Sequence, residues 1–282
     1  MKKEKTLLDE QQRAEVERLK AEILQHIEKY NAFKNFIKVA EDALQVADAL
    51  INNDIQTFKR YQLKYSSHTA EKMRGMCSLS TYKKTSNICS FLSQHDGICQ
   101  KCYAERSLSL YTATLKPLLI YNTLLLKYID IDAQQVPYIN DKYFRFEAFS
   151  DLQSAKHLKN LVTICRKNKN TIFTLWTKAG YKLVNYIDDE KIKLPSNLNI
   201  IISEFYINKK TDPQYLEQLQ KYLYPSQAVK NKYNNALKCF VVFDDEKQRA
   251  ASNMYLCKNK CINCLKCYKK TKNILYIAER IH

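Results

Sequence analysis

The segment TIFTLWTKAGYKLVNYIDDEKIKLPSNLNIIISEF (residues 171–205) predicts a strand, a helix and a second strand in direct succession. Its two ends, TIFTLWT (171–177) and LNIIISEF (198–205), are short and nearly unbroken apolar runs, which is the pattern of strands buried on both faces of a sheet. Residues 180–193, which lie between these runs, have a helical pattern. A strand that returns through a helix to a second buried strand is the unit of a parallel sheet, so the segment predicts an α/β fold.

The same alternation continues on both sides of this segment. Further strands are expected at MCSLSTY (76–82), YFRFEAF (143–149), LKCFVVF (237–243) and NILYIAE (273–279), and further helices at 103–128, 151–168 and 213–223. Pro117 predicts a kink in the first of these helices. Five or six such units predict a partial parallel β/α barrel or an open α/β sheet, and in both folds ligands bind at the carboxyl ends of the strands.

An apolar stripe with alternating three- and four-residue spacing runs through the N-terminal part of the chain. Its members are Val16, Leu19, Ile23, Tyr30, Phe33, Ile37, Ala40, Leu44, Ala47 and Ile51. This stripe predicts one long helix, either in a dimeric coiled coil or docked on the body, with His26 as a tolerated polar residue in the seam. A break is expected at Asn52–Asp54, before a shorter helix at 55–63. We expect three segments: a helical extension (1–69), an α/β barrel with the first cysteines (70–245) and a cysteine-rich end (246–282).

The composition bounds the class of protein. Of the 282 residues, 45% are hydrophobic, which is enough for a sizeable core. The 46 Lys and Arg against 29 Asp and Glu give a net charge of +17, which favours a polyanionic partner, nucleic acid first; general solubilising lysine is the alternative. Three glycines exclude a glycine-rich phosphate loop. No apolar run reaches the length of a membrane span, and no signal peptide is recognisable at the N-terminus, so we expect a cytoplasmic protein.

Most of the ten cysteines fall into two sets. The early set is Cys89, Cys99 and Cys102, with Cys77 upstream; the late set is Cys257, Cys261, Cys264 and Cys267. Because cytosolic thiols stay reduced, such clusters are more often metal ligands than disulfides, and a C-x2-C pair lets two thiolates converge on one metal centre. The remaining two, Cys165 and Cys239, are expected to be buried structural residues.

The late set favours a [4Fe–4S] cluster. Its C-x3-C-x2-C-x2-C spacing is denser than that of a zinc ribbon and resembles a ferredoxin cluster loop, and an all-cysteine zinc site is the alternative. Lysines surround it at positions 258, 260, 266, 269, 270 and 272. Together with Tyr255 and Tyr268 these lysines suit single-stranded nucleic acid, or else they compensate the negative charge of a cluster.

The early set is the expected reaction centre. It follows the first strand of the body, and therefore lies at the carboxyl edge of the predicted sheet. If only Cys89, Cys99 and Cys102 bind a [4Fe–4S] cluster, one iron stays open for a substrate or cofactor. If Cys77 is the fourth ligand, the cluster is closed. Whether the two sets hold one cluster or two stays open at this point.

Other polar residues follow the strands at the same edge. Glu147, Asp151, Lys178 and Glu204 are candidate catalytic residues for proton transfer. Asp151, Glu204 and Trp176 are candidates for binding the amine, ribose or ring of a cofactor. Three alternatives are an N-cap role for Asp151, a solvated rim position for Glu204 and a core position for Trp176.

The order of these motifs resembles that of a known family. SLST (78–81), C-x2-CYAE (99–105), RFEAFSDLQS (145–154), TIFTLWTKAGYKL (171–183), LNIIISE (198–204) and a final C-x2-C-x2-CY (261–268) follow one another. The order resembles the gene product 88 proteins of phages and prophages, which in turn resemble phage proteins that look like radical-SAM barrels. The resemblance covers the chain from about Met73 onward and leaves out the N-terminal helix.

The resemblance implies a radical-SAM-like barrel in a bacterial host cell, with one or two [4Fe–4S] clusters and S-adenosylmethionine as a candidate cofactor. It implies that the early and late sets match the cysteines of that family, that Asp151 matches a recurrent strand-end aspartate and that Lys178 lies in a recurrent Thr-Lys pair. The chain departs from radical-SAM enzymes in two ways. Their compact C-x3-C-x2-C occurs only in the late set, and their Gly-Gly-Glu stretch is missing.

Two functions are expected from these observations. The first is an iron–sulfur enzyme that acts on nucleic acid or a nucleotide. The second is a non-catalytic nucleic-acid-binding protein stapled by zinc or iron–sulfur sites. Self-association through the N-terminal helix is a further expectation.

Overall fold

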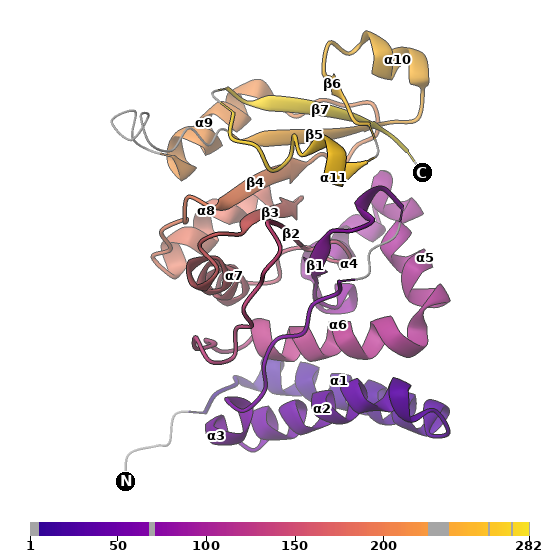
Figure 1. Cartoon of the computed structure of the whole chain (residues 1–282), viewed down its shortest axis with the longest axis vertical. Helices are drawn as coiled ribbons and strands as arrows, with labels where there is room; N and C mark the ends of the chain where they lie inside the picture. The colour runs from indigo at the N-terminus through magenta and orange to yellow at the C-terminus, as the bar shows by residue number, and fades with distance from the viewer. Residues whose placement is uncertain (1–5, 68–70, 225–236, 259, 272, 282) are drawn as a thin grey trace.

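The chain folds around one all-parallel sheet (Figure 1) in a computed structural model that describes residues 6–67, 71–224, 237–258, 260–271 and 273–281. Within these residues the sheet has seven strands in the order β1-β2-β3-β4-β5-β7-β6. Their bounds are Cys77–Leu79 (β1), Tyr143–Phe146 (β2), Ile172–Thr177 (β3), Leu198–Ser203 (β4), Lys238–Phe243 (β5), Tyr255–Leu256 (β6) and Leu275–Arg280 (β7). The sheet is open, with β1 and β6 at its edges.

Helices connect the strands and precede the sheet. The α-helices are Glu10–Tyr30 (α1), Lys34–Ile51 (α2), Ile55–Phe58 (α3), Asn87–Ser93 (α4), Tyr103–Leu110 (α5), Thr112–Leu126 (α6), Ala155–Lys167 (α7), Gly180–Asp189 (α8), Pro213–Leu223 (α9), Glu246–Ala251 (α10) and Cys261–Cys264 (α11). Short 3-10 turns occupy Glu71–Met73 (η1), Lys83–Thr85 (η2) and Ile98–Lys101 (η3).

The strand order decides which face each connection covers. Strands β1 to β5 lie side by side in chain order, so right-handed crossovers bring α7, α8 and α9 to the same face of the sheet (Figure 1). The step from β6 to β7 runs in the reverse direction, because β7 inserts between β5 and β6. A right-handed crossover in the reverse direction lies on the other face, and this crossover is the segment that holds the late cysteine set.

We call this second face the inner face. Its side chains alternate along the strands with those of the main core, and they are Arg145, Trp176, Asn199, Ile201, Lys238, Phe240, Val242, Ile277 and Glu279. Four of them form a small apolar cluster against which Cys257 and Cys267 pack, namely Ile201, Phe240, Val242 and Ile277. The segment that carries the late cysteine set therefore packs on this part of the inner face, where no long helix lies among the described residues.

The structure confirms the alternating α/β pattern and the strands predicted from apolar runs, whereas a closed barrel is not formed. The predicted single helix at 103–128 is divided at Tyr111 into α5 and α6, and Pro117 lies inside α6. The two-residue strand β6 has no apolar run of its own, and it was not predicted.

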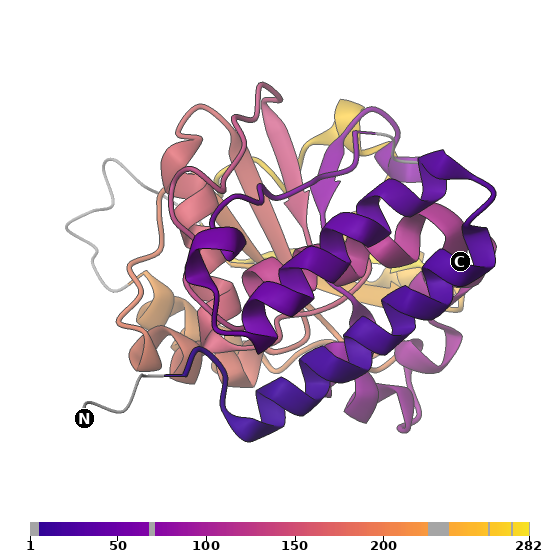
Figure 2. The same ribbon diagram turned by 90° about the horizontal axis from the view of Figure 1, so that it is seen from below.

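The N-terminal helix is present but is divided into two antiparallel helices that lie side by side beneath the sheet (Figure 2). The chain reverses at residues 31–33, so the predicted single helix is wrong. The two halves of the stripe pack on each other and on α6, where Val16, Ile23 and Ala47 are buried in the main core. The predicted break at Asn52 is confirmed, because this residue ends α2.

Two carboxylates of α1 tie this hairpin to the body. Glu15 accepts hydrogen bonds from Lys127 Nζ (2.6 Å) and Tyr128 Oη (2.8 Å), and Glu22 accepts one from Tyr82 Oη (3.0 Å). The main core runs from Leu8 to Ala278 and joins all three predicted segments. Their first boundary falls at residues 68–70, outside the described residues. In the part of the chain that the structure describes, no helix has the length and apolar character needed to cross a membrane.

Candidate functional site

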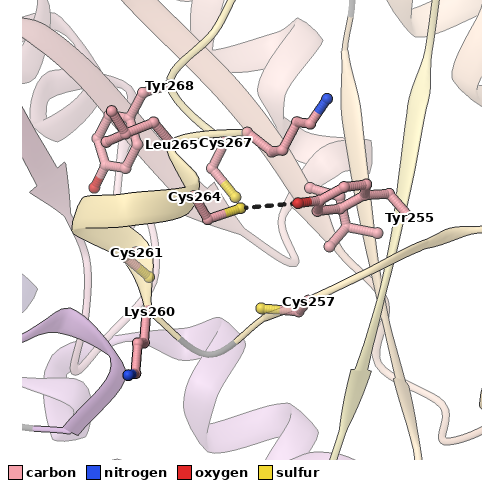
Figure 3. A pocket seen from close by; sticks show the side chains of 10 residues that line it. Tyr255, Cys257, Lys260, Cys261, Cys264, Leu265, Cys267 and Tyr268 are labelled. Atoms are coloured by element: carbon pink, nitrogen blue, oxygen red, sulfur yellow. Dashed lines mark hydrogen bonds between the residues drawn. The ribbon is translucent and has the colours of Figure 1, made fainter.

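The late cysteine set lines a single cavity on the inner face (Figure 3). Cys257 follows β6 and is fixed by its backbone N–H, which donates to the Ala278 carbonyl (2.8 Å). Cys261 and Cys264 begin and end the single turn of α11. Leu265 then adopts a left-handed conformation (φ +54°) that turns the chain, so that Cys267 faces the same space. All four sulfur atoms point toward the cavity, and the four cysteines fall within eleven residues of the sequence.

Two buried cations on the inner face lie close enough to the late set to affect the pKa of Cys267. Lys238 on β5 is fully buried, and its Nζ donates to Asn199 Oδ1 (3.2 Å). Arg145 on β2 is 8% exposed; its guanidinium lies 4.4 Å from the centre of the Trp176 ring and donates to Met73 Sδ (3.0 Å). The Nε atom of Arg145 has no hydrogen-bond partner. Neither cation has a carboxylate partner among the described residues.

The thiols and the cations influence each other electrostatically. Burial, and after it the neighbouring Cys261 and Cys257, raise the pKa of Cys267 to about 12, whereas Lys238 and Arg145 act in the opposite direction. Burial lowers the pKa of Lys238 to about 8, and Cys267 counteracts this shift. Each group therefore makes the charged form of the other more favourable.

Lys72 and Glu279 are two further charged groups near the late set. The Lys72 Nζ lies 2.5 Å from Glu279 Oε2, and both side chains lie close enough to Cys261 to affect its pKa. Because this carboxylate is paired with its own lysine, it leaves the charges of Lys238 and Arg145 uncompensated.

The early set gathers in the connection after β1. Cys89 lies on α4, Cys99 in η3 and Cys102 at the N-cap of α5. The loop that carries Cys99 is fixed to the segment after β4, where Ile98 N donates to the Phe205 carbonyl (3.1 Å). Glycine is required at position 97, because a Cβ there would lie 2.6 Å from the Phe205 ring.

A lysine and an aspartate accompany the early set. Burial lowers the pKa of Lys178, but Cys99, Asp151 and Cys89 outweigh this effect, and the net shift is upward. Burial raises the pKa of Cys89 to about 12, and Asp151 adds to this shift. Lys178 and Asp151 thus both act on the early set, whereas Glu279 is the carboxylate that acts on Cys261 of the late set.

Cys77 lies away from both sets. It begins β1, at the amino edge of the sheet, and its Sγ donates to the Asp141 carboxylate (3.1 Å), which precedes β2. The early set follows the opposite, carboxyl end of β1. The structure thus brings three cysteines together in the early set and keeps Cys77 apart.

Asp151 links the ends of two strands. It is buried after β2 and accepts hydrogen bonds from Thr177 Oγ1 (2.5 Å) and Lys178 N (2.8 Å) at the end of β3. Burial raises the pKa of its carboxyl group. Its predicted alternative as an N-cap is wrong, because Ser154 caps α7 by accepting from the His157 backbone N–H.

The other strand-end candidates are engaged within the protein. Glu147 is buried, has φ +52° and accepts from Thr81 Oγ1 (3.1 Å), with His157 Nε2 3.4 Å away. Glu204 accepts from Thr211 Oγ1 and from the N–H of Phe205 (2.8 Å) in its own loop. Trp176 lies partly buried between Arg145 and Phe240, as the core alternative expected.

Sequence reasoning missed the two inner-face cations, Arg145 and Lys238. The signal was present, because each is a charged residue inside an otherwise apolar strand, in YFRF and KCFVVF. Cys165 and Cys239 are fully buried in the main core, which confirms that prediction. Among the described residues, no three His, Cys, Asp or Glu side chains stand in an arrangement that could hold a metal ion.

A comparison with protein families places the chain. The family model described as gene product 88 matches residues 48–270, which is most of the chain. The chain belongs to the gene product 88 family. The gene product 88 region begins at the end of α2 and contains the early and late cysteine sets, while α1 and most of α2 precede it. No curated protein and no solved structure matches the chain.

Proposed function

We propose that this gene product 88 protein is an iron–sulfur protein, in which Cys257, Cys261, Cys264 and Cys267 hold a [4Fe–4S] cluster. The observation that carries the proposal is the pair of buried cations near the late set. Lys238 and Arg145 have no carboxylate partner in the described structure, and both act on the pKa of Cys267, one of the four cysteines that line the cavity.

The proposal depends on the charges of Lys238, Arg145 and the thiols of the late set. Burying two cations beside protonated thiols destabilises the folded protein, because a buried charge loses its hydration and here has no counter-charge to replace it. A metal centre bound by four thiolates carries net negative charge, and this charge would balance both cations. The C-x3-C-x2-C-x2-C spacing favours iron–sulfur over zinc, which would satisfy the same charges.

The early set is proposed as the site that faces a substrate. Cys89, Cys99 and Cys102 would hold a second cluster at the carboxyl edge of an open parallel sheet, where ligands bind in such folds. An iron–sulfur cluster supplies one-electron transfer when it is bound. Lys178 would compensate the charge of the thiolates, and Asp151 would hold the backbone at Lys178 in place.

The first experiment is metal analysis of protein purified without oxygen. We expect a brown protein that contains iron and acid-labile sulfide. Cys264→Ala should lose part of both, whereas Cys239→Ala, which removes a buried thiol outside both sets, should keep them. A colourless protein that contains zinc would overturn the iron–sulfur proposal.

The net charge of +17 favours a second candidate function, in which the same sites only staple a nucleic-acid-binding protein. The first candidate function is a radical-SAM-like enzyme that acts on nucleic acid or a nucleotide. It differs from the second because it requires a cluster at the early set that reacts with S-adenosylmethionine. Reduced protein with S-adenosylmethionine should then release 5′-deoxyadenosine, and Cys99→Ala should abolish the release. No release from a protein with intact clusters favours the non-catalytic candidate.

A further inference from the structure

Exposed aromatic side chains gather around the early set at the carboxyl edge of the sheet. Phe91 and Tyr103 follow β1, Tyr181 follows β3 and Tyr206 follows β4, and each is between 49% and 59% exposed. Large aromatic residues gain from burial, so several exposed at one edge call for an explanation.

Contacts between the loops bring these residues to one region. The Cys99 loop is bonded to Phe205, the neighbour of Tyr206, and the two rings lie 5.0 Å apart. Tyr103 follows Cys102, and its Oη donates to the Ala148 carbonyl after β2. Lys178 is influenced by both Cys99 and Tyr103, and Tyr181 lies one turn further along. These contacts therefore join the segments that carry Tyr103, Tyr181 and Tyr206 to the early set.

Basic side chains accompany the aromatic ones. Lys209 Nζ lies 4.7 Å from the centre of the Tyr206 ring, and Lys182 Nζ lies 5.7 Å from that of Tyr181. Further basic residues in the segments after β1, β3 and β4 are Lys84, Lys101, Arg106 and Lys210, against the acidic residues Asp96, Glu105, Glu204 and Asp212. Three of these acids are engaged, because Glu105 pairs with Lys83, Glu204 bonds within its loop and Asp212 caps α9.

We propose that this edge binds single-stranded nucleic acid, with bases stacked on Tyr181 and Tyr206 and phosphates beside Lys182 and Lys209. Aromatic rings interleaved with lysines suit a single strand, because each base offers a face for stacking and each phosphate a negative charge. The inference deepens the proposed function by naming the surface that presents the strand to the early set.

The basic segment around the late set is a poorer surface for stacking. Tyr268 is buried and Tyr255 lines the cysteine cavity, so neither ring is free to stack on a base. Of the lysines predicted there, Lys266 lies 5.0 Å from the Tyr255 ring and Lys272 lies outside the described residues. The aromatic rings available for stacking are those at the carboxyl edge.

The chain offers a matched control for a binding experiment. Tyr138 is a second exposed tyrosine with a lysine over its ring, but it precedes β2 at the amino edge, as exposed Lys169 precedes β3. Affinity for a labelled single-stranded DNA or RNA of about 15 nucleotides is measured by fluorescence anisotropy. The edge variant is Tyr206→Ala with Lys209→Ala, and the control is Tyr138→Ala with Lys169→Ala.

We expect the edge variant to bind roughly tenfold more weakly or worse, the control to bind as the wild type does, and all three to contain equal iron. Binding by the wild type with equal losses in both variants would place the strand elsewhere. A wild type that binds no single-stranded nucleic acid would overturn the inference. The iron content tests the proposed function separately, so the two failures are distinguishable.

Discussion

The two cysteine sets contain the same ligand type but differ in their surroundings. The late set lines a cavity on the inner face, near Lys238 and Arg145, which have no carboxylate partner among the described residues. The early set lies at an edge of the sheet, where Lys178 and Asp151 partly compensate each other. If the proposed clusters are present, the late one would chiefly stabilise the fold by compensating these cations, while the early one would lie where ligands bind in such folds.

The largest expected effect comes from breaking the late set. Cys264→Ala removes one thiolate, so the metal should be lost and both cations left uncompensated. We expect the free energy of unfolding to fall by about 5 kcal/mol. Thermal unfolding with metal analysis measures both quantities. The control, Cys239→Ala, should cost only about 1 kcal/mol, as a small loss of packing, and equal losses in the two variants would show that Cys264 contributes no more to stability than an ordinary buried thiol.

A substitution of the buried lysine tests the charge argument by the sign of its effect. Lys238→Met should destabilise the metal-loaded protein by about 3 kcal/mol, because the thiolates lose their counter-charge. In the Cys264→Ala background the same change should stabilise the protein, because it removes an unpaired buried cation. The same sign in both backgrounds would refute the role assigned to Lys238.

The reduction potential of the late cluster gives an independent measurement on this variant. Removing a nearby cation disfavours the more negative, reduced form of a cluster, so Lys238→Met should shift the potential of the late cluster downward. Lys169→Met, at the exposed amino edge, should leave it unchanged.

A matching change in the early set should have a smaller effect on stability. Cys99→Ala should remove the metal of the early set alone and lower the free energy of unfolding by about 1 kcal/mol, because Lys178 keeps Asp151 as a neighbour. Metal analysis and thermal unfolding check this expectation. A loss of stability as large as that of Cys264→Ala would make the two sets equivalent.

The smallest effect is expected for Glu22 on α1, which accepts a hydrogen bond from Tyr82 in the segment that leads to the early set. Burial raises the pKa of Glu22, but Lys116, Tyr82 and Arg18 outweigh this effect, so its pKa lies below the ordinary value. Its contribution to stability is therefore present above that ordinary value and is lost as the pH falls through the lowered pKa. Glu22→Gln should cost less than about 1 kcal/mol near neutral pH and flatten the acid dependence of the unfolding temperature.

The control for this last prediction is Glu17→Gln, since Glu17 is on the exposed side of the same helix. If Glu22→Gln leaves the acid dependence of the unfolding temperature unchanged, the charge of Glu22 does not help to hold this loop in place.

The sequence predicts those parts of the fold that depend on local pattern. Apolar runs such as TLWT and NIII identify the strands, because a strand buried on both faces has no polar side. The sequence predicts the fold poorly where contacts between distant segments determine the course of the chain. The heptad stripe continues through residues 31–33, yet the chain reverses there, because α6 offers an apolar surface to both halves.

Of the candidate site, the sequence predicts only the cysteines that would bind a metal centre. The cysteine spacing identifies both sets, but it does not reveal that β7 inserts between β5 and β6, which brings the late set onto the inner face. Nor does it reveal that Lys238 and Arg145 lie close enough to Cys267 to affect its pKa, since they come from two other strands, β5 and β2. Glu204 and Asp151 share a strand-end position in the sequence, and only the structure shows which donors each of them binds.

We propose that the late set holds a four-thiolate iron–sulfur cluster and the early set a second one. The most direct test is the iron and acid-labile sulfide bound per chain in the wild type, Cys99→Ala and Cys264→Ala, all purified without oxygen. Each variant should keep one cluster of the two expected in the wild type. A wild type that contains no iron, or contains zinc instead, would overturn the proposal.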